Sequence, residues 1–268
     1  MGTVEEAGLQ SCAAEHNPPP STRMTAPIRS TLALRRIALL DGLDDARLDR
    51  IAQACAWHRV AEGQPLLLRA QDRGEVFFLV DGRVRVTTYA ANGRQVTFRD
   101  TAAGELVGDI AAIDGQPRSA DVVTLEDSVV AVLDRATFLA LLREVPELSL
   151  RVMQRLAQLV RQLSERVIDL STLGVQNRLH AELLRMARAA GASGNTARLV
   201  PSPRHVDLAG QISTNREQVT RELNALARAG LLRKEAGALV VVDVDRLARM
   251  VAEVRGEPAP RASGDVLS

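Results

Sequence analysis

The chain has 268 residues, a formal net charge of +1 and two cysteines, and 46% of its residues are hydrophobic. This length allows two ordinary domains, each with its own core. Two cysteines are too few for a disulfide framework, a CxxC metal site or a four-cysteine iron-sulfur cluster, so we expect a reducing compartment and no metal. The apolar runs fall short of the ~20 residues that span a bilayer, and the N-terminus lacks a signal-peptide pattern. We therefore expect a cytoplasmic protein without a membrane partner.

The two ends of the chain lack the pattern of a folded domain. Residues 1–29 contain the run Pro18-Pro19-Pro20 and no periodic apolar face, which predicts a disordered N-terminal extension. Residues 254–268 are expected to form a flexible tail. Between Leu32 and Ala56 apolar positions recur at three and four residues, which predicts short helices at the start of a domain spanning residues 30–145.

Residues 58–134 carry short apolar stretches with a period of two, which predicts β-strands. Asp81-Gly82 and Asn92-Gly93 interrupt them, and such dipeptides are typical of tight hairpins. Evenly spaced strands separated by glycine turns predict a small antiparallel barrel or jelly roll. With the helices before and after it, the barrel predicts an α+β protein.

The helical period returns from Arg135 to Ala189, with interruptions near Pro146 and around Gly174. Within residues 146–172 the apolar side chains are spaced three, four, three, four and three residues apart, which is a heptad seam. Its members are Met153, Leu156, Val160, Leu163, Val167 and Leu170. Two interpretations remain open: this helix pairs with its copy in a homodimer, or the stripe packs on the barrel.

Residues 173–253 have the pattern of a winged helix-turn-helix domain. A short helix over residues 205–211 is followed by a turn and a second helix that starts near Thr214. The stretch "GLLRKEAGALVVVD" predicts two strands around Ala236-Gly237, as in a hairpin wing. The residues expected to close the small core are Val206, Leu208, Ile212, Val219, Leu223 and Leu226.

The second helix of this domain is expected to bind DNA. Residues 174–250 carry twelve basic and seven acidic side chains, a net charge of +5, which favours the phosphate backbone. Arg216 and Arg221 suit guanine. Glu217 either accepts from a cytosine amino group or closes a capping box with Thr214. The expected DNA-binding residues are Ser213, Thr214, Asn215, Arg216, Glu217 and Arg221.

The order of barrel, pairing helix and winged helix resembles the CRP/FNR (catabolite activator) family of bacterial transcription regulators over about residues 32–250. "VGDIAAIDGQPRSA" is similar to the phosphate-binding cassette of that family. "LSERV" with "NRLHAELLRMA" resembles its dimer helix and the helix that follows, and "STNREQVTREL" resembles its recognition helix. The resemblance implies a homodimer without catalytic activity, in which a cyclic nucleotide controls binding to an inverted repeat in double-stranded DNA. RNA polymerase is a further expected partner, through the loop at residues 191–198.

The same resemblance implies a set of nucleotide-binding residues. They are Gly108, Asp109, Ile110, Ala111, Arg118, Ser119, Leu163 and Ser164. Arg118 and Ser119 would hold the cyclic phosphate, and Asp109 stands where the family has a glutamate that accepts from the ribose hydroxyl. Ser164 would reach the base across the dimer interface. Leu163 stands where cyclic-AMP-responsive members carry threonine, but leucine cannot donate to an adenine. The choice of purine therefore stays open, with cyclic AMP as the first expectation and cyclic GMP, or tolerance of both, as the alternative.

Other functions fit the residues less well. Asp109 and Leu163 leave open a regulator of the same architecture that is ligand-independent or gated by another small molecule. An oxygen-sensing cluster or a haem lacks ligands, because Cys12 falls in the expected disordered extension, Cys55 in an apolar helix, and His58 is the only histidine of the sensor domain. The sequence has no HExxH or GxSxG motif, so we expect no enzyme.

Overall fold

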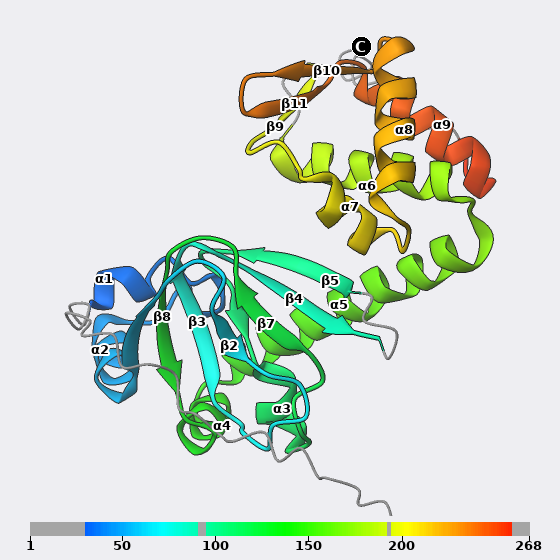
Figure 1. Cartoon of the computed structure of the whole chain (residues 1–268). Helices are drawn as coiled ribbons and strands as arrows, with labels where there is room; N and C mark the ends of the chain where they lie inside the picture. The colour runs from blue at the N-terminus through cyan, green and yellow to red at the C-terminus, as the bar shows by residue number, and fades with distance from the viewer. Residues whose placement is uncertain (1–29, 91–94, 192–193, 259–268) are drawn as a thin grey trace, which may run out of the picture.

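The computed structural model describes residues 30–90, 95–191 and 194–258. In these ranges the chain forms a β-barrel with helices around it, a long helix, and a C-terminal domain of helices with a small sheet (Figure 1). The predicted disorder of residues 1–29 and the Asn92-Gly93 turn lie outside the described residues, as does the tail from residue 259 onward.

The barrel is built from antiparallel strands only. They form two four-stranded sheets, ordered β1-β8-β3-β6 and β2-β7-β4-β5, which confirms the antiparallel barrel within an α+β fold. The strands are β1 (Ala56–Val60), β2 (Pro65–Leu67), β3 (Val76–Asp81), β4 (Arg83–Tyr89), β5 (Gln95–Ala102), β6 (Leu106–Val107), β7 (Asp121–Thr124) and β8 (Ser128–Leu133).

The prediction of a hairpin at Asp81-Gly82 is wrong. Strands β3 and β4 lie in different sheets, so this dipeptide carries the chain from one sheet to the other. Gly82 has a φ of +91°, and a Cβ there would lie 2.3 Å from the Ser128 hydroxyl oxygen, so only glycine fits. Strands β4 and β5 do pair with each other, from Arg83↔Ala102 to Tyr89↔Gln95, as the predicted hairpin requires.

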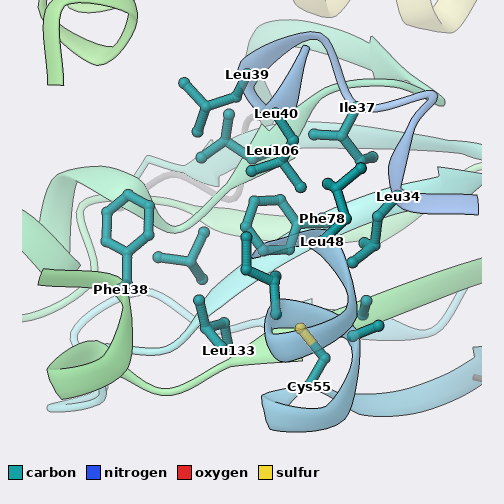
Figure 2. Packing of buried hydrophobic residues seen from close by; sticks show 14 of the residues in the cluster. Leu34, Ile37, Leu39, Leu40, Leu48, Cys55, Phe78, Leu106, Leu133 and Phe138 are labelled. Carbon is teal, nitrogen blue, oxygen red and sulfur yellow. The ribbon is translucent and has the colours of Figure 1, made fainter. Parts of the chain in front are cut away.

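Two apolar clusters hold the barrel together. One lies between the sheets and consists of Leu67, Leu79, Val84, Val107, Val122 and Val130. The other joins the β1-β8-β3-β6 sheet to α1 (Thr31–Leu34), the 3-10 turn η1 (Ala38–Leu40), α2 (Asp45–Ala54) and α4 (Arg135–Glu144). Figure 2 shows Cys55 inside this second cluster with Phe78 and Leu133. Burial, with a smaller effect of Asp134, raises the pKa of the Cys55 thiol to about 12, so Cys55 is a protonated core residue.

The long helix α5 (Pro146–Thr172) starts on the barrel and ends away from it (Figure 1). Leu148 and Val152 are buried in the barrel core, and Leu156 packs against that core, so this member of the predicted seam does not face outward with the others. Met153, Val160 and Val167 are each about 60% exposed. The helix therefore packs on the barrel through its first turns and presents an apolar stripe through the rest.

The C-terminal domain has its own apolar core. Its elements are α6 (Val175–Ala190), β9 (Ala197–Leu199), α7 (His205–Gln211), α8 (Arg216–Arg228), β10 (Leu232–Glu235), β11 (Ala238–Val241) and α9 (Val244–Arg255). The predicted core positions are buried except for Val206, which is 54% exposed, so its assignment to the core is wrong. Val206 lies about 200° around α7 from the buried Leu208, so it is on the opposite face of this helix.

The wing is present as predicted. Strands β10 and β11 pair from Leu232↔Val241 to Glu235↔Ala238, and β9 adds a third strand to their sheet. Gly237 turns the hairpin with a φ of +70°.

Candidate functional site

The loop between β6 and β7 holds the predicted phosphate-binding residues. Arg118 is 4% exposed, and its guanidinium donates to the carbonyl oxygens of Gly108 at 2.8 Å and Glu75 at 2.7 Å. A Cβ on Gly108, whose φ is +89°, would lie 2.8 Å from Nη1 of Arg118 and 2.7 Å from the Glu75 oxygen. Glycine is therefore required at position 108 because Arg118 packs against it.

The charge of Arg118 has one weak counter-ion. An oxygen of the Glu75 carboxylate lies 3.3 Å from Nη2, and the buried Nε of Arg118 has no hydrogen-bond partner. Burial lowers the pKa of Arg118, and Glu75 opposes this effect. A buried cation with a spare N–H group can gain from an anion that approaches it.

The Asp109 carboxylate is paired with Arg155, a residue that the sequence patterns did not single out. Asp109 is the first residue of helix α3 (Asp109–Asp114) and is 2% exposed. Its carboxylate forms an ion pair with Arg155 of α5, which also donates to the carbonyl oxygen of Leu106 at 2.9 Å. The Asp109 carboxylate thus ties the cassette to the long helix, in place of the ribose contact that the family resemblance implies.

A cavity of about 730 Å³ lies between the barrel, α5 and the C-terminal domain. Of the predicted nucleotide-binding residues, Ile110, Ser119 and Leu163 line it. The cavity lining does not include Gly108, Asp109, Ala111 or Arg118. The remaining barrel residues of the wall are Val86, Phe98, Arg99 and Ala120.

Ser164 is on another face of α5. Together with Val160, Leu163, Val167 and Ile168 it lines a shallow depression on the exposed stripe of this helix. Its hydroxyl donates to the carbonyl oxygen of Val160 at 2.9 Å. Within one chain Ser164 is therefore outside the cavity, on the surface where a second copy would have to bring it to a ligand.

The predicted DNA-binding residues lie at the start of α8. Asn215, Arg216, Glu217 and Arg221 are exposed, and Ser213 and Thr214 are half-buried in the turn before the helix. The Asn215 side chain caps the helix by accepting from the backbone N–H of Gln218 at 2.9 Å. The capping box between Thr214 and Glu217 is thus wrong, and the Glu217 carboxylate faces solvent.

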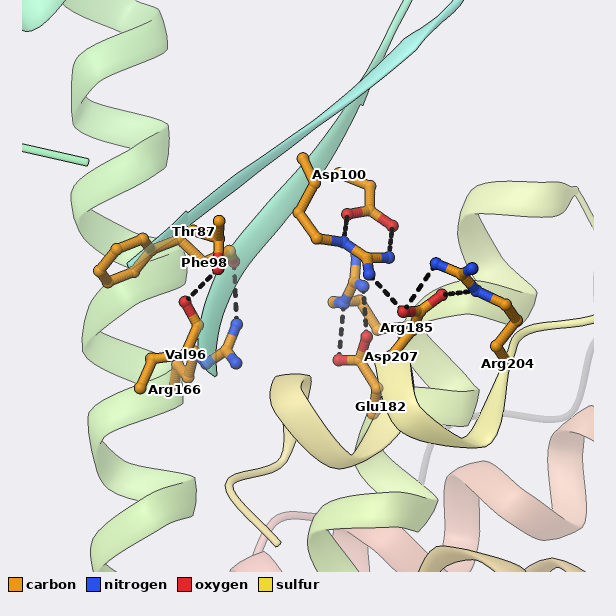
Figure 3. Close-up of polar contacts among 10 residues, drawn as sticks. Thr87, Val96, Phe98, Asp100, Arg166, Glu182, Arg185, Arg204 and Asp207 are labelled. Atoms are coloured by element: carbon orange, nitrogen blue, oxygen red, sulfur yellow. Dashed lines mark hydrogen bonds and ion pairs between the residues drawn. The ribbon is translucent and has the colours of Figure 1, made fainter. Parts of the chain in front are cut away.

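Hydrogen bonds and ion pairs join the C-terminal domain to the barrel. Arg85 of β4 bonds the Asp100 carboxylate with two hydrogen bonds of 2.7 and 2.8 Å and the Asp207 carboxylate of α7 with one of 2.5 Å. Arg204 donates to the same Asp207 carboxylate at 2.9 Å. Figure 3 shows Asp100 of the barrel and Asp207 of α7 bonded to the same guanidinium group, that of Arg85.

A second contact runs through α5. The Arg166 guanidinium donates to the carbonyl oxygen of Phe98 on β5 at 2.9 Å (Figure 3). It also donates to the carbonyl oxygen of Gln211 at the end of α7. All three residues line the cavity. The wall of the cavity is thus bonded directly to the helix that precedes the predicted recognition helix.

Sequence reasoning missed four residues that shape this region: Glu75, Arg99, Arg155 and Arg166. Glu75 directly precedes β3, Arg99 lies on β5, and Arg155 and Arg166 lie on α5; none of them belongs to a motif. In the described ranges no group of histidine, cysteine and carboxylate side chains could hold a metal ion, and no helix there is long and apolar enough to cross a membrane.

Family models match both halves of the chain. A cyclic nucleotide-binding domain matches residues 57–145, and a Crp-like helix-turn-helix domain matches residues 177–250. The "Cyclic AMP receptor protein" of Thermus thermophilus is 32% identical over 181 residues, which cover 67% of this chain and 81% of that protein. The chain belongs to the CRP/FNR family of transcription regulators.

Other relatives agree with this CRP/FNR assignment. The "CRP-like cAMP-activated global transcriptional regulator" of Mycobacterium tuberculosis is 21% identical over 217 residues, 81% of this chain and 97% of that protein. A solved CooA mutant from Carboxydothermus hydrogenoformans has the same fold, with a TM-score of 0.69 and 20% identity over 84% of this chain and 97% of that one. As a CRP/FNR regulator the protein is a DNA-binding transcription factor and not an enzyme.

Proposed function

We propose that this CRP/FNR regulator is a homodimer that senses a cyclic nucleotide and binds an inverted repeat in double-stranded DNA. The observation that carries the proposal is the cavity of about 730 Å³ between the barrel, α5 and the C-terminal domain, which is lined by Ser119, the residue that follows Arg118. This volume lies in the range of small-molecule sites. Its lining combines apolar side chains with polar and charged ones in about equal number, and a nucleotide has both an apolar ring and polar groups.

The phosphate end of the proposed site is built from Arg118 and Ser119. The buried Arg118 has an unsatisfied Nε and only a 3.3 Å contact to the Glu75 carboxylate. A cyclic phosphate carries one negative charge and several acceptor oxygens, so it can take the place of Glu75. The Ser119 hydroxyl, which lines the cavity, can add a further donor.

Arg166 offers a route from the ligand to the DNA-binding domain. It bonds Phe98 in the cavity wall and Gln211 at the end of α7, and His205 of α7 contacts Thr220 of α8 at 2.7 Å. A ligand shifts a conformational equilibrium only by binding one state better than the other. We therefore expect the nucleotide to favour the position of α7 and α8 that fits DNA.

The DNA-binding mode follows from two copies of α8. Two recognition helices related by a twofold axis fit half-sites about one helical turn apart, so the target is an inverted repeat. The apolar stripe of α5 is the proposed dimer surface, with Met153, Val160, Leu163, Val167 and Leu170 exposed on it. The proposed surface for RNA polymerase is the segment at residues 191–198, of which residues 192 and 193 lie outside the described residues and residues 197 and 198 belong to β9 rather than to a loop.

A second candidate is a regulator of the same architecture that needs no cyclic nucleotide or responds to another molecule. The ion pair between Asp109 and Arg155 favours this second candidate, because Arg155 already binds the carboxylate that would accept a hydrogen bond from a ribose. At the phosphate end, Glu75 likewise contacts Arg118, the side chain that would bind the phosphate.

Isothermal titration calorimetry on the full chain separates the two candidates. The ligands are cyclic AMP, cyclic GMP and cyclic di-GMP, with 5′-AMP as a nucleotide that has an open, more highly charged phosphate. The proposal expects saturable binding of a cyclic mononucleotide and none of 5′-AMP. Absence of heat from all of the cyclic nucleotides would favour the second candidate.

A further inference from the structure

Arg99 lies in the cavity at the side opposite the phosphate end. In the β2-β7-β4-β5 sheet Val86 of β4 pairs with Val122 of β7 on one side and with Arg99 of β5 on the other. Two strand spacings, about 10 Å, therefore separate Arg99 from β7. Ser119 lies just before β7, and both Ser119 and Arg99 line the cavity. A cyclic mononucleotide with its phosphate at Ser119 can extend its base across β4 to Arg99.

Arg99 shares the cavity wall with apolar side chains. Phe98 and Val86 line the same wall, and Leu163 of α5 also lines the cavity. In the described parts of the chain Arg99 forms no hydrogen bond and no ion pair. Arg85 and Arg155, by contrast, each bond carboxylates directly.

Burial lowers the pKa of Arg99, and the nearby Arg155 acts in the same direction. Asp109 and Glu105 oppose this effect, but both carboxylates are paired with Arg155. A partly desolvated guanidinium without a direct acceptor gains when a ligand supplies acceptor atoms.

Guanine and adenine differ in the hydrogen-bond acceptors that they present to a guanidinium group such as that of Arg99. The outer edge of guanine presents two acceptors, O6 and N7, which match the two donors of an arginine fork. Adenine presents N7 and an amino group at the same edge, so one arginine donor would face another donor. Leu163 cannot accept from that amino group either.

We propose that Arg99 selects a 6-oxopurine, so that this site prefers cyclic GMP over cyclic AMP. The inference rests on the proposed function, because it concerns the base of the nucleotide that the cavity would hold. Arg99 would donate two hydrogen bonds to O6 and N7 while Phe98 and Leu163 contact the ring.

The test compares cyclic GMP, cyclic IMP and cyclic AMP by calorimetry on the full chain. Cyclic IMP has O6 and N7 but lacks the 2-amino group of guanine, so it isolates the edge that Arg99 would bind. One bidentate arginine contact discriminates between bases by roughly 5- to 150-fold. We expect cyclic GMP and cyclic IMP to bind more tightly than cyclic AMP by a factor in this range.

Arg99→Leu should remove this difference by weakening the two 6-oxopurines and leaving cyclic AMP nearly unchanged. Arg59→Leu is the matched control, because Arg59 is an exposed arginine on β1 of the other sheet, and it should leave all affinities as they are. Thermal unfolding verifies that both variants are folded.

Three other outcomes would contradict the inference that Arg99 selects a 6-oxopurine. Equal binding, or tighter binding of cyclic AMP, would overturn the selection of guanine while the proposed function stands. An equal loss of all three nucleotides in Arg99→Leu would make Arg99 a phosphate contact. Absence of binding by all three to the wild-type chain would overturn the proposed function and this inference with it.

Discussion

Arg118 supports the fold as well as the proposed phosphate site, because its guanidinium bonds the carbonyl oxygens of Gly108 and Glu75. We expect Arg118→Ala to abolish nucleotide binding in calorimetry. It should also lower the free energy of unfolding by about 1–3 kcal/mol, since buried acceptors lose their donor. A folded Arg118→Ala protein that binds nucleotide like the wild type would refute the pocket.

Ser119→Ala separates the effect on nucleotide binding from the effect on stability. Ser119 is exposed and lines the cavity, so its loss should leave unfolding unchanged. A lost hydrogen bond to a charged phosphate should weaken nucleotide binding by about 1.5–3 kcal/mol.

Arg221 is exposed on α8, four residues after Glu217. We expect Arg221→Ala to cost about 1–3 kcal/mol of binding on the preferred DNA site and to relax the base preference at one position of each half-site. Fluorescence anisotropy with site variants measures both quantities. Arg249→Ala, which removes an exposed arginine of α9, is the control for the loss of charge alone. Uniform weakening on every sequence would instead make Arg221 a phosphate contact.

At the scale of residues the sequence predicted which positions carry charge but not what they contact. The cassette pattern singled out Arg118 and Asp109. Their partners Glu75 and Arg155 are 43 and 46 residues away along the chain and belong to no motif. Such pairs depend on how elements pack, which a local pattern does not contain.

Helix α5 packs on the barrel at its start and exposes apolar side chains further along. Its first turns pack on the barrel, and its later turns expose Val160 and Val167. We expect Val160→Glu to place an unpaired charge in the dimer seam and to weaken dimerisation by roughly tenfold or more. Sedimentation velocity measures the change as a shift from dimer to monomer.

Gln158→Glu is the control for this helix. Gln158 is exposed and lies about 200° around the helix from Val160, so its variant should remain a dimer. If Val160→Glu dimerises like the wild type, the stripe is not the dimer surface.

Helices and strands with a regular hydrophobic period could be predicted from the sequence. Turns whose conformation depends on tertiary packing could not. The helical and alternating patterns identified the barrel, α5 and the winged helix. The Asp81-Gly82 dipeptide has the local chemistry of a hairpin, yet it connects two sheets. At the start of α8, Thr214 and Asn215 are both good caps, and only the fold of the preceding turn decides for Asn215.

The contact between the two domains depends on the Asp207 carboxylate. Burial would raise its pKa, but Arg85 and Arg204 outweigh this effect and hold the pKa of Asp207 below its ordinary value of 3.8. Folding therefore gains from the ionised carboxylate above about pH 4, and this gain is lost as the pH falls through the lowered pKa. We expect Asp207→Asn to lower the free energy of unfolding at neutral pH by about 1.5–3 kcal/mol.

Urea denaturation of both proteins between pH 7 and pH 3 tests this dependence. The difference between wild type and Asp207→Asn should narrow as the pH falls below about 4, because the wild-type carboxylate then gains its proton. Glu253→Gln, at an exposed position of α9, should differ little from the wild type at any pH. Equal stability of Asp207→Asn and wild type at pH 7 would show that the ion pair does not hold the domains together.

At the scale of the whole molecule the order of the domains could be predicted, but their contacts could not. The sequence placed a barrel, a long helix and a winged helix in the order observed. Nothing in it indicated that Arg85 and Arg166 of the first part bond Asp207 and the Gln211 carbonyl of the second. These contacts connect the proposed ligand cavity to the DNA-binding domain.

The central claim is that a cyclic nucleotide controls DNA binding by this CRP/FNR regulator. It is tested most directly by selecting random DNA duplexes with the full chain, with and without cyclic GMP or cyclic AMP, and titrating the selected site by fluorescence anisotropy. We predict enrichment of an inverted repeat with half-sites about one helical turn apart, and tighter binding when the nucleotide is present. The same site, bound with the same affinity whether or not a nucleotide is added, would contradict the account.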